Sequence, residues 1–384
     1  MIESDPRDSS SLPRRDFLRL GGAAAAGLVA RDLLPGHQEP AAREPLPSNP
    51  RTQGAMHPNT DSGVAGGAKD ANGANSPSSG AMPTRNLGKT GYRPGIFSLG
   101  GQAAVEKPDN EAMAVSIIER AIDLGVNYID TASAYGGTQR WSQRYIGKVM
   151  PQRRAEVFLT SKTYDRTREG SLRLLEESLR LMNTDHLDLW QLHNVMRMEQ
   201  IEQIFAPGGA IEALQQAREQ KMVRFLGITG HYDPEPLMEG IRRFPFDTVL
   251  MALNAADRHQ YSFAEHLLPL AVEKQLGIIG MKIPARARML ASWNPPPPEA
   301  MATFERPSGG VPSTPGTLTI REAMYYTLTH PVSTIIIGCD NPAQVEENVR
   351  LAQEFTPLSE AQLAELAAKT EAIKRQALFF RRWA

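Results

Sequence analysis

The stretch GVNYIDTASAYG, residues 125–136, decides the fold of this chain. Its apolar run VNYI is typical of a strand buried on both faces, and the acid Asp130 stands directly at the end of that strand. Tyr135 follows shortly after, and Lys162 and His193 come directly after two further apolar runs, VFLTS and LDLWQL. Because the carboxyl ends of parallel strands meet at one mouth of a barrel, we expect these four side chains to lie together.

Short apolar runs alternate with amphipathic segments from residue 84 onward. Strands are expected at Ile96–Leu99, Asn127–Asp130, Val157–Ser161, Leu187–Gln191, Val223–Thr229, Thr248–Ala252, Gly277–Met281 and Thr334–Gly338. Helices are expected at Glu111–Leu124, Gln139–Val149, Arg168–Met182, Ile211–Gln220, Pro234–Arg243, Ala264–Lys274, Ile320–Thr329 and Pro342–Ala352. This alternation predicts an α/β fold, the (β/α)8 TIM barrel. The rival is an open doubly wound sheet, but Gly100–Gly101 lacks the rest of a GxGxxG fingerprint.

Composition excludes several classes of function. The formal net charge of the 384 residues is -1, and no basic stripe with interleaved aromatic residues occurs, so we expect no nucleic-acid binding. The single cysteine, Cys339, excludes an intrachain disulfide framework and any zinc or iron–sulfur site built from cysteines alone. Nothing supports a histidine and carboxylate metal site, so we expect no metal.

The N-terminal segment 1–30 has the features of a targeting signal. Arg14 and Arg15 precede DFLR and a short apolar run, Leu20–Ala30, which resembles a twin-arginine (Tat) export signal, although Pro13 stands where that pattern usually has serine or threonine. The run is too short to span a bilayer, which needs about 20 residues. We therefore expect recognition by the Tat machinery and a periplasmic or envelope location. The alternative is a chance arginine pair on a cytoplasmic protein, and the cleavage site stays open.

A linker and a barrel domain follow the N-terminal segment. Residues 31–83 are rich in Pro, Gly, Ala, Ser and Asn and predict a disordered linker, because they cannot bury enough apolar area to offset their ordering entropy. Residues 84–384 form the predicted barrel and end in a helix from Leu358 to about Gln376. The apolar rings after that helix, those of Phe379, Phe380 and Trp383, are expected to pack back onto the barrel.

The four strand-end residues suit carbonyl chemistry. Reduction of a carbonyl needs a proton at the developing alkoxide, and Tyr135 is the candidate general acid/base. A free phenol has a pKa of about 10, so we expect the ammonium of Lys162 to lower the pKa of Tyr135. Asp130 would hold that ammonium in place, and His193 would orient the carbonyl oxygen.

The ordered segments RNLGKTGYRPGIFSLGG, GVNYIDTASAYG, LTSK, HLDLWQLH, GITG and STIIIGCDNPAQVEENV resemble the aldo-keto reductase family over residues 84–352. The resemblance implies that Asp130, Tyr135, Lys162 and His193 are a catalytic tetrad. It also implies a nicotinamide dinucleotide, NADP or NAD, lying extended across the strand ends.

The same resemblance assigns the adenosine end of that cofactor to Gly338, Gln344, Glu347 and Asn348. Gln344 stands where many NADPH-preferring members carry arginine, and Gly338–Cys339 replaces a Lys–Ser pair of some branches. A missing guanidinium removes a charge-assisted partner for a 2′-phosphate. This weakens the preference for NADP, which we still slightly favour over NAD.

At the nicotinamide end the resemblance implies contacts from Thr229, Asn254, Met281 and Lys282. Thr229 is followed by glycine where a Ser–Asn pair is common, and Met281 with Lys282 replaces a Tyr–Ser pair. A Met–Lys pair also occurs in relatives with a C-terminal iron–sulfur module, but one cysteine cannot hold such a cluster, so we expect none.

The substrate end is less determined. A long connection at residues 284–316 follows the seventh strand and is a candidate lid. The alternative is a disordered surface loop with no functional role. Trp141, Asn194 and His231, together with Tyr164, are expected to line the mouth.

The sequence therefore predicts an NAD(P)-dependent oxidoreductase that reduces a small aldehyde, ketone or sugar, or runs the reverse reaction. Export is in tension with a diffusible cofactor, and a tightly bound cofactor cycling between two substrates would resolve it. A catalytically silent barrel acting as a binding or redox-sensing subunit is the alternative. A hydrolase using Asp130 ranks last, because no second strand-end carboxylate stands at a suitable place.

Overall fold

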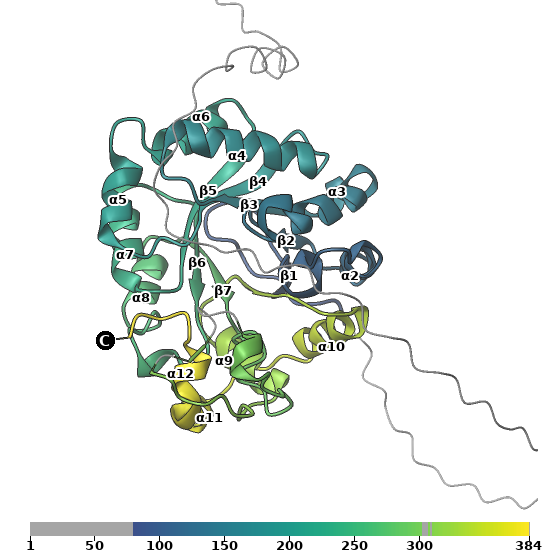
Figure 1. The fold of residues 1–384 in the computed structure, drawn as a ribbon, viewed down its shortest axis with the longest axis vertical. Helices are drawn as coiled ribbons and strands as arrows, with labels where there is room; N and C mark the ends of the chain where they lie inside the picture. Colours follow the sequence, from purple (N-terminus) through teal and green to yellow (C-terminus); the bar gives the residue numbers. More distant parts are fainter. Residues whose placement is uncertain (1–79, 302–305, 308, 384) are drawn as a thin grey trace, which may run out of the picture. The chain divides into compact units, whose positions relative to one another are not determined.

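The computed structural model of the protein describes residues 80–301, 306–307 and 309–383. The predicted signal segment and nearly all of the predicted linker lie outside these residues. Eight parallel strands close into a barrel in which β1 pairs with β8 (Figure 1). The strands are β1 Phe97–Gly100, β2 Tyr128–Asp130, β3 Phe158–Thr163, β4 Leu187–Leu192, β5 Val223–Gly230, β6 Thr248–Ala252, β7 Gly277–Met281 and β8 Thr334–Ile337. The predicted TIM barrel is confirmed.

Helices surround the strands (Figure 1). They are α2 Glu111–Asp123, α3 Trp141–Arg153, α4 Arg168–Leu181, α5 Met198–Phe205, α6 Ala210–Glu219, α7 Pro234–Arg243, α8 Leu267–Glu273, α9 Ile320–Thr329, α10 Pro342–Gln353, α11 Glu360–Lys369 and α12 Lys374–Ala377. Short 3-10 turns lie at η1 Ala103–Glu106, η2 Gly137–Gln139, η3 Arg154–Glu156, η4 Asp257–His259, η5 Pro298–Ala300 and η7 Glu371–Ile373.

Side-chain caps fix where several helices begin. The hydroxyl of Thr167 accepts a hydrogen bond from the backbone N–H of Gly170 at the start of α4. Thr319 and Glu322 form a reciprocal capping box at the start of α9. Each cap satisfies N–H groups that the first helical turn leaves without partners.

Helix α5 was not predicted from the sequence. Its N-cap residue is Arg197, which lacks the short polar side chain that usually marks a helix start. The helix forms because tertiary packing favours it, since Ile201 and Ile204 are fully buried.

The N-terminal base of the barrel is covered by the segment before β1, in which Thr84 and Gly95 form an antiparallel bridge. Leu87 is fully buried there. The guanidinium of Arg85 donates to the carbonyl oxygens of Val332 at 2.8 Å and His330 at 3.4 Å, close to the start of β8. The base is therefore closed by contacts between the segment before β1 and the segment before β8.

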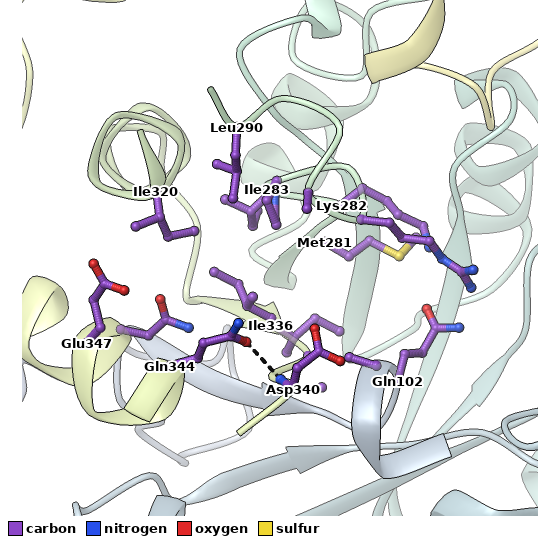
Figure 2. A pocket seen from close by; sticks show the side chains of 18 of the residues that line it. Gln102, Met281, Lys282, Ile283, Leu290, Ile320, Ile336, Asp340, Gln344 and Glu347 are labelled. Carbon is purple, nitrogen blue, oxygen red and sulfur yellow. Dashed lines mark hydrogen bonds between the residues drawn. The ribbon is translucent and has the colours of Figure 1, made fainter. Parts of the chain in front are cut away.

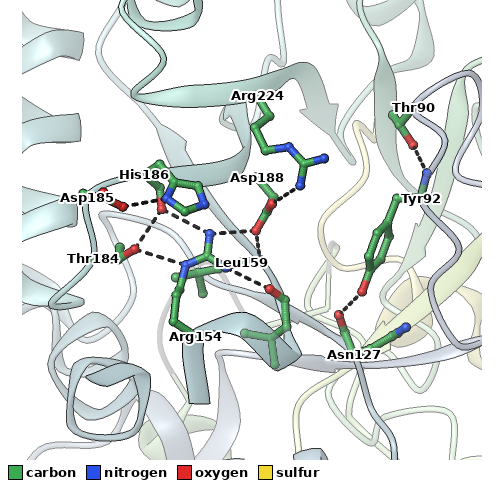
Figure 3. Close-up of polar contacts among 11 residues, drawn as sticks. Thr90, Tyr92, Asn127, Arg154, Leu159, Thr184, Asp185, His186, Asp188 and Arg224 are labelled. Atoms are coloured by element: carbon green, nitrogen blue, oxygen red, sulfur yellow. Dashed lines mark hydrogen bonds and ion pairs between the residues drawn. The ribbon is translucent and has the colours of Figure 1, made fainter. Parts of the chain in front are cut away.

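A buried carboxylate ties three strands together near this base (Figure 3). Asp188 of β4 accepts hydrogen bonds from Arg154 at 2.8 Å, from Arg224 at 2.7 Å and from the backbone N–H of Leu159 at 2.9 Å. A charged group out of water needs such partners, and here they come from segments beside and within β3 and β5. The cluster thereby fixes the register of β3, β4 and β5 at the closed end.

The C-terminal segment packs back onto the barrel, as predicted. The expected single helix is broken into α11, η7 and α12, after which Phe379 and Phe380 are buried. The side chain of Arg381 is fully buried and pairs with Asp257. Within the described residues no helix is both long and apolar enough to cross a bilayer.

Candidate active site

A buried ion pair lies at the mouth of the barrel between the ends of β2 and β3. The ammonium of Lys162 is 2.5 Å from Asp130 Oδ2 and donates to the carbonyl oxygen of Thr131 at 2.8 Å. Thr160 donates to the other oxygen of Asp130 at 3.0 Å. Both charged side chains are 1% exposed, so each charge depends on the other and on these hydrogen bonds.

Two aromatic rings complete the cluster. The ring centroid of Tyr135 lies 5.0 Å from the ammonium of Lys162 and 5.7 Å from the ring centroid of His193, which it meets edge to face. The backbone N–H of His193 donates to the carbonyl oxygen of Thr163 at 2.7 Å, which fixes its loop against β3. The four residues expected to meet at the strand ends are thus brought together.

The expected effect of Lys162 on the phenol is not seen. Burial, followed by the charges of Asp130 and Glu106, holds the pKa of Tyr135 well above that of a free phenol. The ammonium of Lys162 is neutralised at 2.5 Å by Asp130, so little of its charge reaches the phenol. Tyr135 therefore stays protonated in this state.

His193 is neutral for a related reason. Burial and the neighbouring charge of Lys162 hold the pKa of His193 well below the usual histidine value. Burial also lowers the pKa of Lys162, although Asp130 opposes this shift. A neutral imidazole can donate from one ring nitrogen and accept at the other, which suits it to orient a carbonyl oxygen.

Tyr135 and Asp130 line a cavity of about 750 Å³. Figure 2 shows other residues that line it. The walls come from the ends of β1, β7 and β8 and from α10. The lining residues are Gly100–Ala103, Glu106, Lys107, Asp130, Tyr135, Met281–Pro284, Arg286, Ala287, Leu290–Ser292, Leu318–Ile320, Ile336–Gly338, Asp340, Gln344, Glu347 and Asn348.

Most of the residues predicted to hold a cofactor line this cavity, namely Met281, Lys282, Gly338, Gln344, Glu347 and Asn348. Thr229 and Asn254 are not among the lining residues, and each is 1% exposed. The amide of Asn254 donates to the carbonyl oxygen of Lys282 at 3.0 Å, so it holds the backbone beneath the cavity. The hydroxyl of Thr229 accepts from the backbone N–H of Asn194 at 2.9 Å. Contact of these two residues with a cofactor stays a prediction.

The predicted substrate residues also lie outside the cavity lining. Trp141 stacks on Tyr145 at the start of α3. His231 packs edge to face against Phe380 of the C-terminal segment. Asn194 adopts a left-handed backbone conformation with φ 52°, held by its bond to Thr229. Asn194 and His231 follow the ends of β4 and β5, whereas Trp141 lies between β2 and β3.

Sequence reasoning missed the loop after β1. Gln102, Glu106 and Lys107 line the cavity, and the amide of Gln102 lies 3.3 Å from both carboxylate oxygens of Glu106. Their place directly after a predicted strand is the feature that could have identified them.

The candidate lid contributes its first part to the cavity. Residues 285–287 all have positive φ, a conformation that costs energy for residues with a side chain. Arg286 at the centre of this turn lies 3.9 Å from Glu106 on the opposite wall. This part of the 284–316 connection therefore borders the cavity between Tyr135 and α10.

Acid should destabilise the fold through His231. Burial, and next the charge of Lys282, lowers the pKa of His231 to about 3, whereas an unfolded histidine titrates near about 6.5. Between these values the unfolded chain binds the extra proton, so stability is lost as the pH falls below about 6.5. Denaturant unfolding should show that going from about pH 7.5 to about pH 5.5 costs the unmodified chain about 1.4 kcal/mol more than the His231→Asn variant. Equal losses in the two proteins would contradict this.

Comparison with known proteins agrees with the fold. Residues 94–371 match the family model described as "Aldo/keto reductase family". The chain is 27% identical to L-galactose dehydrogenase of Arabidopsis thaliana over 308 residues, covering 76% of this chain and 95% of that protein. An aldo-keto reductase from Bacillus halodurans, solved in a holo form, is 24% identical with a TM-score of 0.60, covering 76% of this chain and 97% of that one.

A second solved structure is an aldo-keto reductase from Klebsiella pneumoniae in complex with NADPH, which is 20% identical with a TM-score of 0.58 and covers 74% of this chain and 94% of that one. The likeness to these structures concerns the fold alone. The family match spans most of the described barrel, from the residues before β1 to η7. The chain therefore belongs to the aldo/keto reductase family.

Proposed function

We propose that this protein is a nicotinamide-dependent oxidoreductase that interconverts a carbonyl group and an alcohol, with Tyr135 as general acid/base. One observation carries the proposal. A protonated phenol opens onto a 750 Å³ cavity beside the buried pair Lys162–Asp130 and a neutral His193. This set supplies a proton donor, a charge to stabilise the phenolate, and a group to orient the carbonyl oxygen.

The residues present fit a nicotinamide dinucleotide. The cavity volume is in the usual range of about 300–1,000 Å³ for ligand sites, and it extends from Tyr135 to α10 rather than closing around the phenol. Lys282 and Arg286 line its wall between these two ends and can face the two phosphates of a dinucleotide. When bound, this cofactor supplies or accepts the hydride.

Residues of the chain transfer the proton and stabilise the charge that the transfer leaves behind. In the reducing direction Tyr135 gives its hydroxyl proton to the carbonyl oxygen as the hydride reaches the carbonyl carbon, which leaves an alcohol and a phenolate. Lys162 then stabilises the phenolate, because its ammonium is close to the ring and is held by Asp130. The imidazole of His193 hydrogen-bonds the same carbonyl oxygen and aligns it with the phenol.

The substrate is proposed to be a small aldehyde, ketone or sugar. Proteins similar to this chain are named for such compounds, including L-galactose dehydrogenase and methylglyoxal reductase, the latter 35% identical over 103 residues. We further propose that residues 1–30 act as a Tat signal and direct the protein to the periplasm or cell envelope. That segment lies outside the described residues.

Purified full-length protein tests the reaction. It should consume NADH or NADPH in the presence of a panel of small aldehydes, ketones and sugars, as followed by the absorbance of the reduced cofactor. Native mass spectrometry of the same sample would determine whether a nicotinamide nucleotide copurifies. Binding of cofactor without turnover of any carbonyl or alcohol would favour the catalytically silent barrel instead.

A further inference from the structure

Charge is distributed unevenly along the cavity. Among the described residues that line it, the cations Lys282 and Arg286 come from the segment directly after β7. The α10 end is lined instead by the carboxylates of Asp340 and Glu347 and by the amide of Gln344 (Figure 2). Positive charge thus borders the middle of the cavity, and negative charge borders its far end.

The position of the proposed proton donor determines the direction in which a dinucleotide would lie in the cavity. The carbon that receives hydride must lie next to the phenol of Tyr135, so the nicotinamide belongs at that end of the cavity. The rest of an extended dinucleotide has to follow the cavity toward α10, which brings its adenosine ribose to the end lined by Asp340 and Glu347. This step rests on the proposed function.

Two N–H groups at the start of α10 already have partners. Helix N-termini commonly bind phosphates through N–H groups that lack partners. Here Asn341 Oδ1 accepts from the N–H of Gln344 at 3.0 Å, and Gln344 Oε1 accepts from the N–H of Asp340 at 2.8 Å, the bond drawn in Figure 2. The amide of Gln344 therefore serves the helix start.

A single cation, Lys107, lines the cavity near these groups among the described residues. Its ammonium is 3.0 Å from Asp340 Oδ1, and both side chains are more than half exposed. An exposed pair of this kind contributes little to stability. A phosphate could nevertheless bind the ammonium of Lys107 only in competition with the carboxylate of Asp340, which would remain beside it.

We propose that this protein selects NAD over NADP, contrary to the slight preference for NADP expected from the sequence, and that Asp340 is a determinant of that choice. A phosphate on the 2′-oxygen carries about -1.5 to -2 charges at neutral pH. At this end of the cavity it would meet two carboxylates, and the one cation beside them among the described residues, Lys107, is paired with Asp340. The 2′- and 3′-hydroxyls of NAD can instead donate hydrogen bonds to carboxylate oxygens, as an acidic residue does for the ribose in dinucleotide-binding sheets.

Calorimetric titration of the full-length protein with NADH and with NADPH tests this. The dissociation constant for NADH should be at least about tenfold lower, a difference of about 1.4 kcal/mol. Raising the ionic strength should narrow the gap, because salt screens repulsion between the phosphate and the carboxylates.

Two variants with the same change of charge locate the effect. Asp340→Asn removes one carboxylate and releases Lys107, so the preference for NADH should fall by about tenfold. Glu346→Gln is the matched control. Glu346 lies on α10, six residues after Asp340, but pairs with Arg120 at 2.8 Å and does not line the cavity, so the ratio of the two constants should stay unchanged.

Each outcome separates the two proposals. If the unmodified protein binds NADPH as tightly as NADH or more tightly, the selectivity is wrong while the proposed function stands. If the two variants behave alike, Asp340 is not the determinant. If neither cofactor binds, the proposed function fails and the selectivity fails with it.

Discussion

Replacing Tyr135 by phenylalanine should reduce kcat by about 10²–10⁴-fold, the usual contribution of a positioned general acid. The substitution removes only the hydroxyl, so the ring contact with His193 can persist. In the proposed mechanism the phenol acts on the reacting oxygen and not on the cofactor, so the dissociation constant of the reduced cofactor should change little.

Steady-state kinetics and cofactor titration of the Tyr135→Phe variant measure both quantities. Tyr164→Phe is the matched control, since Tyr164 also follows a strand but is 52% exposed and lies outside the cavity lining. Retention of full turnover by Tyr135→Phe would remove the proposed acid from the mechanism. Loss of turnover in both variants would mean that the effect is not specific to the phenol.

Breaking the pair between Lys162 and Asp130 should lower the free energy of unfolding by about 3–5 kcal/mol, as is typical when one partner of a buried ion pair is removed. Both side chains are 1% exposed at a separation of 2.5 Å. Lys162→Met leaves a carboxylate without its ammonium, and Asp130→Asn leaves an ammonium without its carboxylate. Urea denaturation monitored by circular dichroism measures the loss.

The double variant Asp130→Asn, Lys162→Met supplies the control for this prediction. It leaves neither charge unpaired, so it should be more stable than the sum of the two single losses implies. Additive losses would show that the two charges do not depend on each other. Turnover should fall in the two proteins that carry Lys162→Met, because the phenolate of Tyr135 loses its stabilising ammonium in both.

The barrel could be predicted because its strands are apolar on both faces and each is followed by a helix with a clear period. The predicted strand ends agree with the structure to within two residues. Helix α5 was not predicted because its N-cap residue is Arg197 rather than a residue with a short polar capping side chain. Local sequence therefore determined the elements wherever local start and stop signals were present.

The candidate site was predictable to the extent that it depends on strand ends. Asp130, Tyr135, Lys162 and His193 converge because the barrel brings the ends of β2, β3 and β4 to one mouth. Which way a side chain turns depends on contacts that no single segment contains. Asn254 faces the backbone of Lys282, and the pKa of Tyr135 follows burial rather than its distance from an ammonium. Such outcomes need the packed structure.

The closed base of the barrel has a consequence for synthesis of the chain. Arg85 bonds carbonyl groups that lie 245 and 247 residues later in the sequence. Ribosomes add about 5–20 residues per second, so the segment before β1 waits about 12–50 s for its partners. During that time β1 has no β8 to pair with, and its edge is open to other chains. Chaperones that bind nascent chains would therefore be expected to act on β1 until β8 leaves the ribosome.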